Sequence, residues 1–191
     1  VPVLDGLASG TKAHFEHLKV LETLLDGQPK LAKRVLGELL QYEPENVERW
    51  IALRDVATTD GEWALAVRCQ ERVARAGQST AADWLRLAEL CCEELGDVDQ
   101  AVRVLREARL LYPSASSLHT RLLEYLRSQG DHGGVRAMLR EGLVKAGRGE
   151  RIKVYEELVA FERDKIGEAE ALNTLFEALE DTNAFRALSP S

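Results

Sequence analysis

Hydrophobic residues recur along this chain at helical spacing. One such stripe consists of Ala101, Val104, Leu105, Ala108 and Leu111. Apolar positions at i, i+3, i+4 and i+7 predict an amphipathic α-helix that buries one face. Ten segments of about 12 to 19 residues carry a stripe of this kind.

Short polar or glycine-containing breaks separate these segments. They fall at residues 26–29, 43–46, 60–61, 77–80, 96–97, 112–114, 130–131, 147–149 and 167. Glycine, proline and capping residues such as Asp97 and Asp131 mark the ends of helices. The pattern therefore predicts an all-α protein whose helices are joined by short connections.

Landmark residues repeat about every 34 positions. Trp50 and Trp84 are 34 residues apart, and the same step reaches Leu118 and then Ile152, each early in a predicted helix. Alternate helices keep this step to within one residue at Ala32, Ala66, Ala101 and Val135. A fixed period of this length predicts that the helices form pairs, with a first and a second helix in each repeat.

The repeat resembles the tetratricopeptide repeat. The residues that carry the resemblance are Trp84, Leu87, Ala88 and Cys91 in a first helix, and Ala101, Leu105, Ala108 and Pro113 in and after a second helix. Gln70 departs from the pattern, because it stands where a large apolar residue is expected. The resemblance implies a right-handed α-solenoid of about five helix-turn-helix hairpins.

The resemblance also divides the chain into three parts. Residues 1–10 form an N-terminal segment, 11–181 the tetratricopeptide-like repeat domain, and 182–191 a C-terminal tail. A single segment containing Tyr155, Leu158, Phe161, Glu162 and Gly167 is similar to the half-a-tetratricopeptide repeat of RNA-processing factors.

Charge and cysteine content limit the function classes. The chain has 25 Lys and Arg against 32 Asp and Glu, a net charge of -7, with arginine concentrated on second helices and carboxylates on first helices. No apolar run approaches the roughly 18 to 20 residues of a membrane span. Neighbouring side chains on a helix diverge, so Cys91 and Cys92 do not suit a disulfide. We expect reduced thiols and a cytoplasmic protein.

Motifs for catalysis or metal binding are absent from the sequence. His14 and His17 share a helix face, but no third ligand is placed near them. Cys91 lies on an apolar stripe, which argues against a nucleophile paired with His119. We therefore expect no metal site, no cofactor and no enzymatic activity.

The resemblance implies that first helices provide the partner-binding surface. In the register set by Trp50 and Trp84, the expected partner-binding residues are Glu48, Asp55, Leu85, Glu89, Glu93, His119, Leu123 and Arg127. Such an acidic surface with apolar patches suits a basic or amphipathic segment of another protein. Asp55 and Glu89 stand where chaperone-binding members carry the asparagine of a carboxylate clamp, which argues against a receptor for chaperone tails.

Second helices carry a separate series of arginines. Arg72, Arg106 and Arg140 are 34 residues apart and would form a basic ridge on the outer surface. Either they pair with glutamates of their own helices, or they bind an acidic partner or RNA phosphate.

The leading hypothesis is a non-catalytic protein-interaction scaffold. The alternatives are an RNA-processing assembly factor of the half-a-tetratricopeptide type and a regulatory domain of a larger enzyme. Nucleic acid is the less favoured partner. A homodimer also stays open, because the tail with Phe185 and Leu188 would either cap the last hairpin or dock onto a neighbouring copy.

Overall fold

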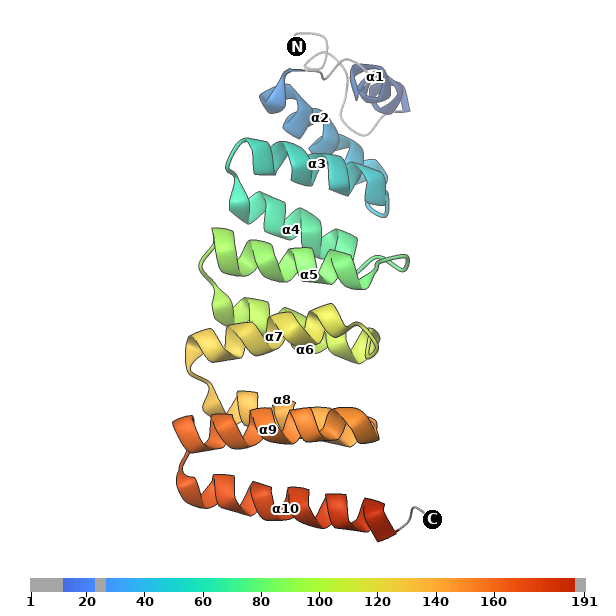
Figure 1. The fold of residues 1–191 in the computed structure, drawn as a ribbon. Helices are drawn as coiled ribbons and strands as arrows, with labels where there is room; N and C mark the ends of the chain where they lie inside the picture. Colours follow the sequence, from blue (N-terminus) through green and yellow to red (C-terminus); the bar gives the residue numbers. More distant parts are fainter. Residues whose placement is uncertain (1–11, 23–26, 188–191) are drawn as a thin grey trace. The chain divides into compact units, whose positions relative to one another are not determined.

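The computed structural model describes residues 12–22 and 27–187 (Figure 1). Within these ranges the regular structure is entirely helical. The helices are α1 (Lys12–Glu22), α2 (Pro29–Tyr42), α3 (Val47–Thr59), α4 (Trp63–Ala74), α5 (Ala81–Glu89), α6 (Val98–Leu111), α7 (Ser116–Gln129), α8 (His132–Lys145), α9 (Arg148–Lys165) and α10 (Glu168–Ala187). This confirms the all-α prediction. The predicted N-terminal segment 1–10 and the end of the tail, 188–191, lie outside the described residues.

Local sequence explains where the helices start and stop. Asp97 accepts a hydrogen bond from the backbone N–H of Gln100, and Asp131 accepts one from Gly134, each at 2.8 Å. Both aspartates follow a glycine with positive φ, Gly96 at 68° and Gly130 at 69°. Only glycine adopts this conformation without strain, so the Gly-Asp pair ends one helix and caps the next.

The chain divides into two compact units, Val1–Arg121 and Leu122–Ser191. In the first unit, successive helices from α1 to α6 pack on one another. The small residues of the second helices are buried, with Ala32 at 3% and Ala66 and Ala101 at 0% exposure. Small side chains allow helices to approach closely, as the repeat predicts. In the second unit, α8 packs on α9 and α9 on α10.

A buried glutamine explains one departure from the repeat pattern. The Gln70 side chain is fully buried in α4. Its Nε2 donates to the carbonyl of Asp83 and its Oε1 accepts from Arg54 Nη1, each at 2.7 Å. Because both polar ends are satisfied, the amide links α3, α4 and α5 where an apolar residue would only fill space.

A π-helical turn, Leu90–Glu94, extends α5. Trp84 and Ala101 are 17 positions apart, whereas Trp50 and Ala66 are 16 apart. A π turn accommodates one extra residue without ending the helix. It therefore explains why the step between the second-helix alanines lengthens here.

Ile152 does not occupy the buried position that Trp84 and Leu118 share. Those two side chains are 1% and 0% exposed, whereas Ile152 is 51% exposed. Leu158, which is buried in α9, follows the buried Leu122 of α7 by 36 residues rather than 34. Two extra residues correspond to about 200° around a helix axis, so the 34-residue step reaches an exposed face of α9.

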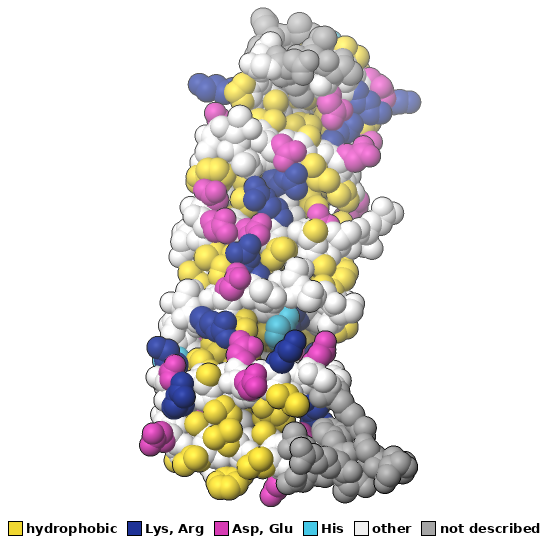
Figure 2. Space-filling model, in the orientation of Figure 1, with side chains coloured by type: hydrophobic (Ala, Val, Ile, Leu, Met, Phe, Trp, Pro, Cys, Tyr) yellow, Lys and Arg dark blue, Asp and Glu magenta, His cyan; other side chains and the backbone are white. Residues whose placement is uncertain are grey.

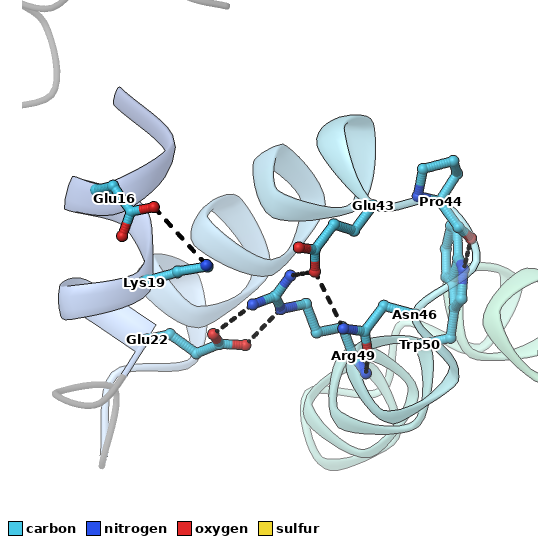
Figure 3. Close-up of polar contacts among 8 residues, drawn as sticks. All are labelled: Glu16, Lys19, Glu22, Glu43, Pro44, Asn46, Arg49 and Trp50. Atoms are coloured by element: carbon cyan, nitrogen blue, oxygen red, sulfur yellow. Dashed lines mark hydrogen bonds and ion pairs between the residues drawn. The ribbon is translucent and has the colours of Figure 1, made fainter. Parts of the chain in front are cut away.

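A buried arginine connects α1, α3 and the end of α2 (Figure 3). The Nε and Nη2 atoms of Arg49 donate to the two carboxylate oxygens of Glu22 at 2.9 and 3.0 Å, and Nη1 donates to Glu43. Asn46 Nδ2 donates to the same Glu43 carboxylate at 3.2 Å. The hydrogen bond from Asn46 and the charge of Arg49 lower the pKa of Glu43 from its ordinary value of 4.5.

This lowered pKa predicts an acid-sensitive contribution to stability. A carboxylate whose pKa is lower in the folded than in the unfolded protein stabilises the fold at pH values above the unfolded pKa. That contribution is lost as the pH falls through the folded pKa. We therefore expect Glu43→Gln to have a lower melting temperature than the wild type at pH 7, with the difference vanishing when wild-type Glu43 is protonated. Melting by circular dichroism between pH 7 and about pH 3 tests this. Glu45→Gln, in the same turn, is the control. An equal melting-temperature difference at both ends of the pH range would contradict the assignment.

Candidate functional site

The structure places all eight predicted partner-binding residues on first helices. They are Glu48 and Asp55 on α3, Leu85 and Glu89 on α5, Glu93 in the π turn, and His119, Leu123 and Arg127 on α7. Within each helix the spacing of four to eight residues puts them on one side. Four are exposed, namely Glu48, Asp55, Glu93 and Arg127, and the others are partly buried.

Arginines near two of these residues change the expected charge of the surface. The Nε and Nη2 atoms of Arg54 donate to Asp55 Oδ1 at 2.8 and 2.6 Å. Arg121 Nη2 lies 3.0 Å from Glu89 Oε1, and Arg86 Nη1 lies 3.9 Å from the other oxygen. Figure 2 shows acidic and basic side chains intermixed over α3 and α5. The surface is thus of mixed charge, whereas the sequence suggested an acidic one.

The Arg121–Glu89 ion pair also has a geometric consequence. It joins α7 to α5, so two first helices of the repeat are neighbours in the first unit. Their outward side chains, Leu85, Glu93 and His119, therefore belong to one continuous surface. Arg121 was not among the predicted residues, although it lies 32 positions after Glu89, close to the repeat period.

In the second unit, Arg127 makes a similar connection. Its Nη2 lies 2.6 Å from Glu157 Oε1 on α9. Leu123, one turn before it on α7, is partly buried. First helices are thus linked by arginine–glutamate pairs in both units.

Each arginine of the predicted outer ridge has interactions within the chain. The guanidinium of Arg72 lies 5.8 Å from the centre of the Trp50 ring. Arg140 lies 3.2 Å from Glu177 and 3.1 Å from the Thr174 hydroxyl. Arg106 is exposed and also interacts within the chain. The contacts of Arg72 and Arg140 thus reach other helices, rather than the glutamates of their own helices that the sequence suggested.

Two surface pockets repeat beside the tryptophans of the first unit. A pocket of about 310 Å³ is lined by Trp50, Arg72 and Arg75, and one of about 440 Å³ by Trp84, Arg75 and Tyr112. Arg75 borders both pockets and forms ion pairs there with Glu71 and Glu107. Arg75 in the walls of both pockets already forms ion pairs within the chain. The pockets therefore offer few charged groups for binding a ligand.

The candidate reactive groups are buried. Cys91 is 0% exposed, and desolvation raises the pKa of its thiol to about 11. Burial likewise raises the pKa of the Cys69 thiol to about 11. Such thiols hold little thiolate at neutral pH. His14 is buried with its Nε2 3.0 Å from Glu38 Oε2, and the described residues contain no group of three side chains suited to a metal ion.

Comparison with solved structures identifies the fold. The structure of Naa15/Naa10 bound to HypK-THB aligns with a TM-score of 0.55 at 14% sequence identity, over 93% of this chain and 26% of that chain. A crystal structure of MamA protein aligns with a TM-score of 0.49 at 16% identity, over 94% of this chain and 96% of that one. YrrB, described as a TPR protein with an unusual peptide-binding site, gives 0.48 at 13% identity, covering 89% and 86%. The chain has a tetratricopeptide-repeat fold.

The tetratricopeptide-repeat resemblance seen in the sequence is therefore confirmed at the level of the fold. The similarity to half-a-tetratricopeptide repeats is not confirmed. The sequence matches no protein-family model and no curated protein. None of the tetratricopeptide-repeat helices in the described ranges has an uninterrupted apolar stretch long enough to cross a bilayer.

Proposed function

We propose that this chain is a non-catalytic scaffold that binds a segment of another protein on its first helices. The observation that carries the proposal is the Arg121–Glu89 ion pair, which joins the start of α7 to α5 within the first unit and so brings Leu85, Glu93 and His119 to one surface. On this surface the exposed carboxylate of Glu93 lies about two helical turns after the partly buried Leu85, and Glu48 is exposed on the preceding first helix, α3. Such a surface suits a basic or amphipathic segment, held by apolar anchors and steered by charge.

The fold supports this proposal by analogy. The Naa15/Naa10 structure, which shares the fold, is bound to HypK-THB. Fold similarity does not assign a partner, so the proposal rests on the surface of this chain.

The buried thiols support a role without covalent catalysis. Cys91 and Cys69 have raised pKa values and no access to solvent, so neither suits a nucleophile. Free cysteines also suit a reducing compartment, and we propose the cytoplasm. RNA binding by the ridge receives less support, because Arg140 already pairs with Glu177.

Binding of a selected peptide tests the scaffold proposal. Peptides would be selected from a displayed random library on the wild-type chain, and the affinity of the tightest would be measured by fluorescence anisotropy. We expect Glu48→Gln/Glu93→Gln to weaken binding about three- to tenfold, with a reduced salt dependence. Asp99→Asn, which removes one carboxylate from the second helix α6, is the control. Equal affinities for the wild type, the variant and the control would contradict the proposal.

A further inference from the structure

Helix α10 carries an exposed apolar stripe. Leu172, Leu175, Phe176 and Leu179 are 53%, 44%, 64% and 57% exposed. Their spacing of i, i+3, i+4 and i+7 puts them on one face of the helix. Among residues 168–181 of α10, whose side chains the structure describes, the buried positions are instead Ala171 and Thr174, which are small. The larger apolar face of this helix is thus the one that the protein leaves exposed.

The stripe borders an apolar groove in the last hairpin. A groove of about 370 Å³ lies between α9 and α10, and its walls include Ile152 and Val159 on α9 and Leu175 and Leu179 on α10. Figure 2 shows hydrophobic side chains gathered over these two helices. Exposed apolar patches of this kind mark surfaces that bind a partner.

The same unit shows what covers a stripe of this type. Helix α8, the second helix of the preceding repeat, packs against α9. Its apolar residues Val135, Leu139 and Leu143 are 0%, 4% and 6% exposed. A second helix in this unit is thus covered by a following helix, and the groove beside α10 has the geometry to receive one.

The charged residues around the groove indicate which kind of partner helix would bind there. Glu156 lines the groove, Glu180 lies one turn after Phe176, and Glu168 one turn before Leu172. The cation in the groove wall, Arg163, is paired with Asp164 at 3.1 Å. Helix α10 carries five acidic residues and one basic residue in EAEALNTLFEALEDTNAFRA, and two of the acidic residues pair with arginines of α8 and α9. This rim attracts a cationic partner and would repel the same rim of a second copy.

We propose that the α9–α10 groove binds an amphipathic helix of another protein whose apolar stripe is flanked by Lys or Arg. All the residues that form this surface lie between 152 and 180, within the second unit. The inference is independent of the first-helix surface proposed above, which is tested with variants in the first unit.

A designed peptide tests the groove directly. The probe is a helix-forming peptide of about 20 residues with Leu at i, i+3, i+4 and i+7 and Lys beside them. We expect Leu175→Gln/Phe176→Gln to weaken its binding at least tenfold, because both apolar anchors are lost. Glu156→Gln/Glu180→Gln should weaken binding about three- to tenfold and reduce its salt dependence. Leu110→Gln/Leu111→Gln on α6, where the leucines are 85% and 58% exposed, is the matched control and should bind like the wild type.

Three results would overturn the proposal. The first is unchanged peptide affinity in the Leu175→Gln/Phe176→Gln variant with a wild-type circular dichroism spectrum. The second is equally tight binding of a peptide in which Glu replaces every Lys. The third is a dimer of the wild type, seen by sedimentation, that the peptide does not dissociate and that is lost in the Leu175→Gln/Phe176→Gln variant. That result would assign the face to a second copy of this chain. If the double variant fails to fold, the two glutamate substitutions decide, because they alter only exposed carboxylates.

Discussion

Replacing Trp84 with Ala should lower the free energy of unfolding by about 3 to 5 kcal/mol. Trp84 is 1% exposed in α5, so its removal leaves a large cavity between hairpins of the first unit. In a repeat protein each hairpin is stabilised by its neighbours, so the loss affects the packing on both sides. Urea denaturation followed by circular dichroism measures the effect.

Trp50 provides the internal comparison, since it lies one repeat earlier. It is only partly buried, and its Nε1 donates to the carbonyl of Pro44 at 2.7 Å. We expect Trp50→Ala to lower the free energy of unfolding by about 1 to 2 kcal/mol. Equal losses for the two variants would contradict the burial that distinguishes these tryptophans.

Replacing Arg136 with Ala should lower the free energy of unfolding by about 2 to 4 kcal/mol. The Glu162 carboxylate is fully buried in α9 and accepts from Arg136 Nε at 2.7 Å and from the Thr174 hydroxyl at 2.6 Å. Without Arg136, the remaining cation is Arg140, 3.6 Å from the carboxylate. A buried charge that loses its close partner pays the desolvation cost without full compensation.

Two further variants separate charge pairing from packing. Arg163→Ala removes an arginine from an exposed pair with Asp164, and it should change stability by less than about 0.5 kcal/mol. Combining Arg136→Met with Glu162→Leu should recover most of the loss, because no unpaired charge then remains. A double variant less stable than Arg136→Ala would show that the carboxylate itself stabilises this hairpin.

The repeat and its boundaries were predictable because they depend on local residues. Gly96 and Asp97 recur as Gly130 and Asp131, and each pair ends and caps helices through its own backbone. The rotation of α9 was not predictable from the period, since the step from the buried Leu122 of α7 to the buried Leu158 of α9 is 36 residues and not 34. For this reason Ile152 is exposed although its position in the repeat matches that of Trp84.

Ion pairs between residues far apart in the sequence could not be predicted, and they determine the charge of the candidate site. The buried Glu162 carboxylate is satisfied by Arg136 from α8 and Thr174 from α10. No sequence pattern within α9 indicates these two partners. The pairing of Glu89 with Arg121 likewise requires the packing of separate hairpins. Residue type and spacing therefore predicted that the candidate residues lie on first helices, but did not predict the arginines that pair with Asp55 and Glu89.

Nuclear magnetic resonance mapping of the library-selected peptide on the ¹⁵N-labelled chain tests the central claim most directly. The scaffold proposal predicts that the largest amide shift changes occur on first helices, around Glu48, Leu85 and Glu93. Shift changes confined to the second helices α4 and α6, around Arg72 and Arg106, would contradict it and move the binding surface to the outer ridge.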